Sequence, residues 1–245
     1  HSSPKSGLRS RAMTPYLLVA PGMIWLITFF IIPIFSLAST STMVRPDGAQ
    51  LGQYVQKFRF QNYIDAFTAN QAQYARSFIY AGIATLLALA IAYPLAYMIA
   101  FRSGKYRNIL LVMVVAPFFT SFLLRVLAWK TVLADDGFLL GPLKAIGLLP
   151  EEFRILATPV AVVFGISYNF FPFMVLPIYV SLEKIDRRLL EAAQDLYASS
   201  WGAFRRVTLP LAVPGIFAGS LLTFIPAIGD FINAELLGNP GTTMI

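Results

Sequence analysis

The chain has 245 residues, of which 57% are hydrophobic and only 13% are charged, and its mean hydropathy is +0.67. This composition lies well outside that of soluble globular domains and predicts an integral membrane protein. The chain contains no cysteine, which excludes disulfides, thiol catalysis and cysteine metal sites, and its only histidine is His1, so a metal centre is not expected. The net charge of +7 does not indicate nucleic-acid binding, because the basic residues lie between the apolar runs and form no patch interleaved with aromatics.

Five long apolar intervals predict membrane-spanning helices. A helix needs about 20 apolar residues to cross the hydrocarbon core of a bilayer. The third uncharged interval is short and reaches that length only if the span continues past Arg125 toward Leu133. The sequence therefore predicts an all-α, polytopic membrane helix bundle in a single transmembrane domain over residues 1–245. The expected spans are residues 16–38, 77–101, 108–133, 155–182 and 207–230.

The first apolar interval follows three basic residues, as the core of a secretory signal peptide does. Its apolar stretch, Tyr16–Ala38, is longer than the roughly 7–15 residues of such a core, and no small-residue cleavage pattern stands out. We therefore expect a helix that is retained.

The distribution of Lys and Arg predicts the orientation of the chain. With the N-terminus in the cytoplasm, eleven of the nineteen basic residues lie on the cytoplasmic side, and so does the whole net charge of +7. Residues 39–76 and 134–154 are then extracellular loops, and residues 183–210 form a cytoplasmic region. Each outer loop is long enough to contact an external partner, although such loops also pack over helix ends.

The first part of the cytoplasmic region, Arg187–Tyr197, predicts a short amphipathic helix. Arg187, Glu191 and Asp195 recur at four-residue spacing and therefore lie on one face. The small side chains of Ala192 and Ala193 let another surface approach the helix backbone closely.

A second short helix is expected after a turn. Ser199 or Ser200 is a suitable cap for it, and Pro210 ends it or turns it into the last span. A pair of helices tied to two spans can transmit force from a soluble partner. Its basic and aromatic residues also suit the alternative of an amphipathic helix that rests on lipid headgroups.

The spacing of this region resembles the EAA loop of ABC-importer permeases. Glu191-Ala192-Ala193 is followed, at the spacing of that motif, by Val207 and by Leu209-Pro210. Tyr197 stands where the family usually has glycine, and Val207 where it has isoleucine. Tyrosine does not favour the left-handed backbone that glycine permits, so we expect a shallower bend or one displaced to residues 198–200. The resemblance implies that an ATPase couples to this chain through Arg187, Glu191, Ala192, Ala193, Asp195, Leu196, Tyr197, Leu209 and Pro210.

Three further blocks are similar to the spermidine/putrescine permease subunits of such importers. The likeness covers roughly residues 16–245. It implies that the transported solute is a polyamine, although permeases for other small solutes share parts of these blocks. The blocks are Arg125-x-x-Ala128-Trp129, Tyr168-Asn169-x-x-Pro172-Phe173, and Gly229-Asp230-Phe231 with Glu235-Leu236-Leu237-Gly238.

The resemblance also implies the composition of the whole transporter. This chain would pair with a second, similar permease, two ATPase subunits would dock on the EAA loops, and an external binding protein would deliver the solute. ATP and Mg would be bound by the ATPase subunits, because this sequence contains no G-x-x-x-x-G-K-[ST] loop. The type I importer fold has six helices in such a subunit, so a sixth span is expected beyond Ile245. The expected location is the bacterial inner membrane, with a cytoplasmic N-terminus and no cofactor, metal or nucleic acid on this chain.

Acidic candidates for the solute path border the last expected span. Asp230 and Glu235 lie near its outer end, where acids can attract a dication. They can equally be solvated at headgroup level, or paired with Arg125 or Lys130. Arg125 itself is expected either to snorkel to the outer surface or to pair with Asp230 and close the path.

Aromatic candidates lie on the fourth expected span. Tyr168, Asn169 and Phe173 supply aromatic faces and one amide, which suit cation–π contact or a gate, although such aromatics also serve ordinary helix packing. Trp129 joins this set through the resemblance.

Two other classes of function compete with an ATP-driven importer. A secondary transporter driven by an ion gradient needs acids near the bilayer centre, which the first four expected spans lack. A membrane-embedded enzyme needs a nucleophile–base pair or a metal constellation, which the sequence does not show. We therefore expect a non-catalytic transport subunit.

Overall fold

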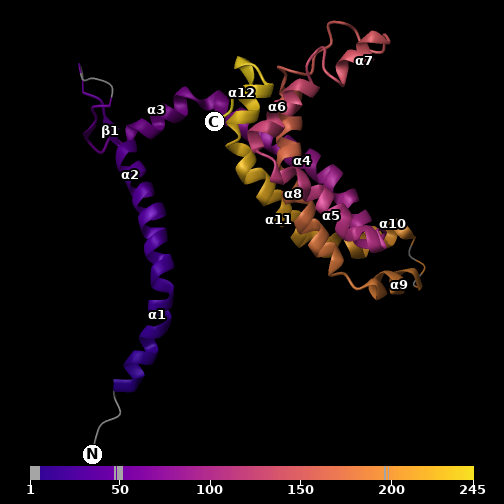
Figure 1. Cartoon of the computed structure of the whole chain (residues 1–245), viewed down its shortest axis with the longest axis horizontal. Coiled ribbons are helices and arrows are strands. Elements are labelled where there is room, and N and C mark those ends of the chain that lie inside the picture. Colours follow the sequence, from indigo (N-terminus) through magenta and orange to yellow (C-terminus); the bar gives the residue numbers. More distant parts are fainter. Residues whose placement is uncertain (1–5, 47, 49–51, 196, 198) are drawn as a thin grey trace, which may run out of the picture. The chain divides into compact units, whose positions relative to one another are not determined.

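The computed structural model describes residues 6–46, 48, 52–195, 197 and 199–245, without the side chains of residues 6–15, 187 and 194. The described chain is mostly helical (Figure 1). It forms two compact units, His1–Asn70 and Gln71–Ile245.

The first unit contains one long apolar helix. Three consecutive segments build it: α1 (Ser6–Leu26), the π-helical η1 (Ile27–Ile31) and α2 (Ile32–Ser41). Within this helix, the 26 residues Tyr16–Ser41 are apolar enough to cross a membrane. No residue of their most apolar stretch is buried. These side chains therefore need lipid or another chain around them.

A small folded element follows this helix. Strands β1 (Met43–Val44) and β2 (Val55–Gln56) pair antiparallel, and α3 (Gln61–Ala69) comes next. The Asn62 side-chain amide donates to the Ser41 carbonyl at 3.0 Å and to the Met43 carbonyl at 2.9 Å. Part of the expected outer loop 39–76 thus has a fixed structure.

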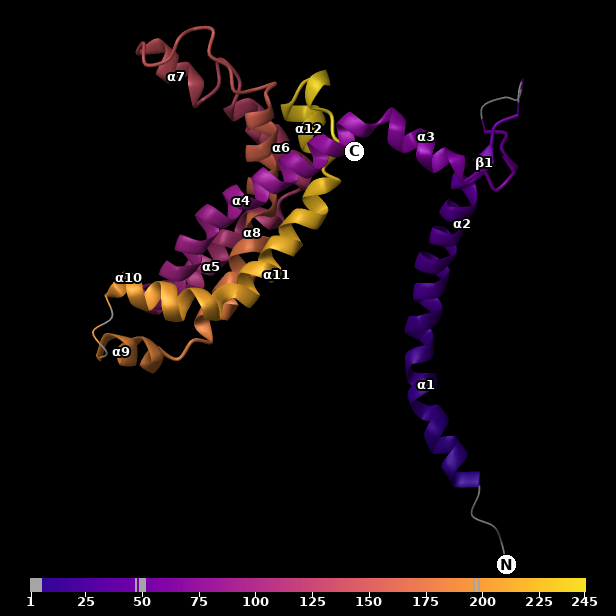
Figure 2. The ribbon, with the colours of Figure 1, turned by 180° about the vertical axis from the view of Figure 1, so that it is seen from behind.

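The second unit is organised around three long helices that pack side by side (Figures 1 and 2). They are α4 (Gln71–Phe101), α8 (Pro159–Glu183) and α11 (Leu209–Ile228). Small side chains permit the close packing, because larger ones would hold the helix axes apart. On α4 four fully buried alanines recur every four positions, at Ala84, Ala88, Ala92 and Ala96.

The expected span 108–133 is broken in the structure. Helix α5 (Arg107–Val115) and the 3-10 turn η3 (Ala116–Phe119) are separated from α6 (Phe122–Val132) by a bend of 96°. Pro117 lacks the N–H that would continue the helix, and Thr120 adopts an extended backbone with φ −90° and ψ 152°. Within the described residues four helices are long and apolar enough to cross a membrane, or five if this bent pair counts as one span.

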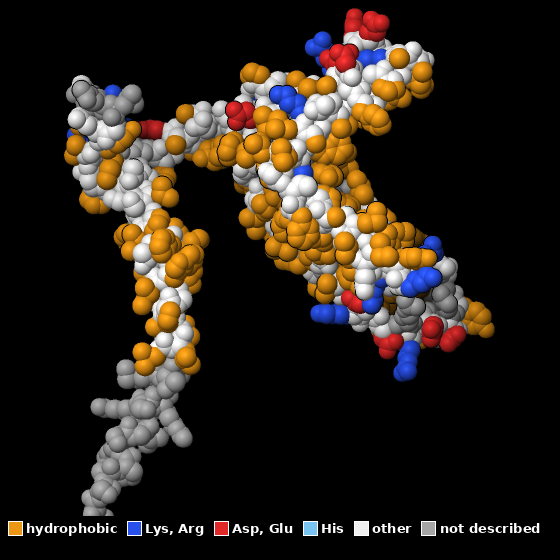
Figure 3. Space-filling model, viewed as in Figure 1, with side chains coloured by type: hydrophobic (Ala, Val, Ile, Leu, Met, Phe, Trp, Pro, Cys, Tyr) orange, Lys and Arg blue, Asp and Glu red, His pale blue; other side chains and the backbone are white. Residues whose placement is uncertain are grey.

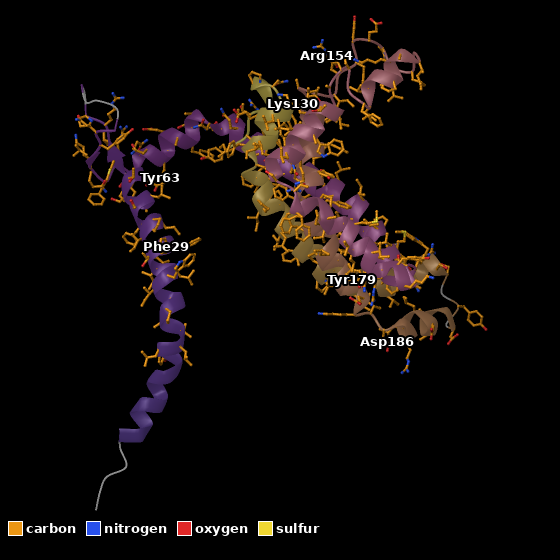
Figure 4. All side chains as sticks on the ribbon, in the orientation of Figure 1. Phe29, Tyr63, Lys130, Arg154, Tyr179 and Asp186 are labelled. Carbon is orange, nitrogen blue, oxygen red and sulfur yellow. The ribbon has the colours of Figure 1, made fainter. Side chains whose placement is uncertain are left out.

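The two ends of the second unit carry different short elements. At one end lie α9 (Arg187–Asp195) and α10 (Ser200–Ala203), and at the other lie α6, α7 (Leu140–Ala145) and α12 (Phe231–Leu237) (Figure 2). Figure 4 shows Asp186 at the first end and Lys130 at the second. The expected cytoplasmic region and the expected outer loop 134–154 therefore lie at opposite ends. The remaining turns are η2 (Gly104–Tyr106), η4 (Phe204–Thr208) and η5 (Pro240–Thr242).

Candidate coupling element and solute path

Helix α9 presents the EAA residues on an open surface. The Asp186 carboxylate accepts a hydrogen bond from the Arg188 backbone N–H at 2.9 Å and so caps the start of the helix. Glu191 and Ala192 are exposed, and Ala193 is half-buried. A partner surface can therefore reach the helix where its side chains are small.

Tyr197 makes the turn after α9. Its backbone has φ +58°, in the left-handed region, and its side chain is 99% exposed. The expectation of a shallower or displaced bend is wrong, because the tyrosine adopts the conformation that glycine favours. The left-handed backbone costs about 1–2 kcal/mol for a residue with a β-carbon, and the solvent-exposed side chain adds no clash with neighbours. Leu196, which the resemblance also places in the coupling set, lies outside the described residues.

Helix α10 is capped by Ser199, one of the two serines that the sequence offers as a cap. The Ser199 hydroxyl accepts a hydrogen bond from the Gly202 N–H at 3.1 Å. The helix then continues through the π-helical turn η4 into α11, where Leu209 and Pro210 are the first two residues. In that turn the Leu209 N–H donates to the Phe204 carbonyl, five residues earlier, which accommodates a proline at the next position. Pro210 therefore does not end the helix, and Ser200–Ile228 is continuous.

Phe204 holds the second helix against α4. Its ring lies edge-on to Tyr93 at 5.8 Å and to Tyr97 at 6.3 Å, and it stacks with Trp201 at 5.1 Å. Movement of α10 is thereby linked to two of the three long helices, to α11 through the continuous backbone and to α4 through these rings.

Arg125 is placed in neither of the two expected ways. Its side chain is only 8% exposed, and among the described residues it forms no ion pair with Asp230. Instead the guanidinium carbon lies 4.9 Å from the centre of the Phe118 ring and 5.7 Å from that of Phe122. The Nε atom is buried without a hydrogen-bond partner. The bend before α6 carries this residue inward, which the hydropathy pattern alone does not show.

Arg125 lines a cavity of about 300 Å³ together with Tyr168. Trp129 lies edge-on to Tyr168, with ring centres 5.1 Å apart, and Phe173 lies edge-on to Phe118 at 5.0 Å. Two of the seven expected path residues, Arg125 and Tyr168, therefore line one cavity. Trp129 contacts the Tyr168 ring, and Phe173 contacts the Phe118 ring beside Arg125. The other lining residues are apolar and come from α4, α5, η3 and α8: Leu95, Leu110, Met113, Val114, Pro117, Phe171 and Pro172.

Asn169 and Asp230 belong to a separate buried network. The Asp230 carboxylate accepts from the Asn233 backbone N–H at 3.1 Å and from its side-chain amide at 2.5 Å. The Asn169 amide in turn donates to Asn233 Oδ1 at 3.3 Å. Asp230 thus caps α12, and it does not line the Arg125 cavity. Glu235, on the same short helix, is exposed and takes no part in the network.

Asn233 was not among the residues that the sequence singled out. It is fully buried and joins α8 to the start of α12. An Asp followed three residues later by a polar side chain is a local capping signal, and this signal would have identified the Asp230–Asn233 contact. The partner Asn169 lies 64 positions earlier, so local spacing does not reveal it.

One ion pair joins two spans near the end that carries α9. Arg107 Nη1, at the start of α5, lies 2.6 Å from Glu183 Oε1, at the end of α8, and both side chains are about 40% exposed. The pair anchors α8 just before the polypeptide enters α9.

Comparison with known proteins identifies the family. Residues 92–245 match the family model described as the binding-protein-dependent transport system inner membrane component. The chain is 42% identical over 222 residues to the Haemophilus influenzae spermidine/putrescine transport system permease protein PotB, covering 90% of this chain and 77% of that protein. It is 36% identical over 221 residues to Escherichia coli PotB, covering 90% and 80%.

A solved structure has the same fold. The crystal structure of a bacterial ABC transporter that imports the acidic polysaccharide alginate matches 95% of this chain and 80% of the matched chain. The TM-score is 0.69 and the sequence identity is 22%, a level that speaks for the fold alone. The chain therefore belongs to the family of binding-protein-dependent transport system inner membrane components and is a non-catalytic permease subunit of an ABC importer.

Proposed function

We propose that this permease carries polyamines, spermidine or putrescine, across the inner membrane. The support is the likeness to the two PotB permeases, which extends over 90% of this chain. The cavity beside Arg125 has walls suited to an ammonium group, because Tyr168 and the neighbouring rings offer faces that attract cations. A permease for another small solute remains the alternative, since an apolar cavity with one arginine does not by itself select a polyamine.

Arg125 keeps this path closed in the proposed mechanism. Its guanidinium covers the faces of Phe118 and Phe122, which are the faces that a solute ammonium group would use. Like charges repel strongly in a medium of low dielectric constant. A polyamine can therefore pass only after α6 has moved Arg125 away from the cavity.

The coupling element drives that movement. Two ATPase subunits, which bind ATP and Mg, dock on α9 and on its counterpart in a second permease, and an external binding protein delivers the solute. ATPase closure displaces α9 and the turn at Tyr197. The continuous helix Ser200–Ile228 and the Phe204 contacts pass the displacement to α11 and α4. In the proposed transporter, the N-terminus and the end of the second unit that carries α9 face the cytoplasm. The observation that carries this coupling route is the continuity of α10 with α11.

Exchanging Glu191 for Lys tests the coupling. In the assembled transporter, Glu191→Lys should leave the two permeases associated and should abolish ATP-driven solute uptake, because an exposed carboxylate of α9 is replaced by a cation at the docking surface. The matched control is Glu152→Lys, an equally exposed acid in the loop at the opposite end. Wild-type uptake by Glu191→Lys would show that this surface does not couple.

Uptake by proteoliposomes separates an importer from a secondary transporter. We expect labelled spermidine to enter only when the ATPase subunits, ATP and the binding protein are present. Uptake by this chain alone, driven by an ion gradient without nucleotide, would establish the secondary transporter.

A further inference from the structure

Two hollows adjoin at the end of the second unit that carries α10. The first, of about 550 Å³, lies between α4 and α10, and its α4 wall is formed by Tyr93, Pro94, Tyr97 and Met98. The second, of about 520 Å³, is polar and is lined by Ser199, Gly202, Arg205 and Arg206. Trp201 lines both hollows, so the two share a wall and lie next to each other.

Three arginines border this double hollow. Arg102, immediately after the last residue of α4, lines the apolar hollow, and Arg205 and Arg206 line the polar one. All three are exposed, and they are absent from the ion pairs formed within the described part of the chain. Figure 3 shows Lys and Arg side chains around this end of the unit. The site therefore presents positive charge next to an apolar wall.

The location of the double hollow matches a membrane boundary. Helix α4 is long and apolar enough to span the bilayer and ends at Phe101. The adjoining helix passes from α10 into α11 at Phe204, which contacts Tyr93 and Tyr97 in the last turns of α4. Trp201 is 69% exposed, and Tyr93 and Tyr97 stand across from it. The two tyrosines are half-buried. An exposed Trp at a span end is typical of the headgroup level of a bilayer, where one part of the ring is apolar and the other part is hydrated.

We propose that the double hollow binds one anionic phospholipid from the leaflet at this end of the unit. An acyl chain lies along Tyr93, Pro94 and Met98, and the phosphate lies among Arg102, Arg205 and Arg206. A phospholipid satisfies both walls at once, and basic pockets beside transmembrane helices favour anionic headgroups. The proposal depends on α4 and α11 crossing the membrane, and it depends neither on the identity of the solute nor on the coupling role of α9.

Photolabelling in nanodiscs tests this site in the assembled transporter. Two preparations differ only in the probe, a photoactivatable phosphatidylglycerol or a phosphatidylcholine with the same acyl chains. We expect phosphatidylglycerol to label the segments 93–98 and 200–204 several-fold more than phosphatidylcholine does. The triple variant Arg102→Gln, Arg205→Gln, Arg206→Gln should reduce that labelling to the phosphatidylcholine level, and Lys at the three positions should retain most of it.

Arg188→Gln is the matched control, because Arg188 is an exposed base on neighbouring α9 that lines neither hollow. It should leave the labelling ratio unchanged. Equal labelling of the wild type by the two lipids would overturn the proposal. Absence of lipid labelling, with cross-links from the same segments to the ATPase or to the second permease, would overturn it as well and would assign the hollow to a protein partner.

Discussion

Gly215 on α11 lies directly against Pro177 on α8: a β-carbon at Gly215 would stand 2.5 Å from the Pro177 carbonyl oxygen and 2.6 Å from the Ser181 β-carbon. Non-bonded atoms do not approach so closely. The two helices therefore contact each other at a distance that only glycine allows.

Replacement of Gly215 by Ala is expected to destabilise the permease by about 1–3 kcal/mol, because the added methyl group overpacks a backbone contact that has little room to relax. Thermal unfolding of the transporter in nanodiscs measures the effect. Gly82→Ala is the control, since a β-carbon at Gly82 on α4 meets nothing within 4 Å. Equal thermal stability of the two variants would contradict the close contact.

Tyr197→Gly is expected to support uptake at or above the wild-type rate. Glycine adopts the left-handed conformation at φ +58° without the cost of a β-carbon. Tyr197→Val should lower uptake, because a β-branched residue is strongly disfavoured at positive φ and would displace α9 relative to α10. ATP-driven uptake in proteoliposomes compares the two. Full uptake by the valine variant would show that the turn geometry does not matter for coupling.

Asp230→Asn is expected to retain both stability and uptake. The asparagine oxygen can still accept the Asn233 N–H and cap α12, whereas Asp230→Ala loses this cap at a cost of about 0.5–2 kcal/mol. Thermal unfolding and spermidine uptake, measured on both variants, distinguish a capping role of Asp230 from a role of its charge in the solute path. A stable Asn variant without uptake would assign the Asp230 charge to the solute path and not to the cap.

Arg125→Met is expected to make the path leak. The substitution removes a buried charge that has no carboxylate partner among the described residues, so stability should be unchanged or higher. Preloaded proteoliposomes should then lose labelled spermidine without ATP faster than the wild type does. Lys130→Met, an exposed base further along α6, is the control and should not leak. A tight Arg125→Met variant would refute the closing role of the arginine.

Features with local causes could be predicted from the sequence. Hydropathy predicted apolar helices at the positions of α4, α8 and α11, because crossing a bilayer requires a continuous apolar run. The capping preference of serine predicted a helix that begins at Ser199 or Ser200, and Ser199 is the residue that caps α10. The four-residue periodicity of Arg187–Tyr197 and the following serine cap predicted two short helices, and the structure has them as α9 and α10.

Features that depend on contacts between distant residues could not be predicted in this way. The burial of Arg125 follows from the 96° bend at residues 120–121, and hydropathy is insensitive to backbone direction. Asn169 meets Asn233 only because α12 folds back onto α8.

The region of residues 187–210 contains both features that the sequence predicts and features that only the tertiary structure shows. The sequence by itself determined that two helices and a turn are present there, since periodicity and capping act within a few residues. Only the tertiary structure decided that Tyr197 takes the left-handed backbone and that α10 runs unbroken into α11. The packing of Phe204 against Tyr93 and Tyr97 of α4 holds the second helix in a position that local propensity does not specify, because these contacts join residues more than 100 positions apart.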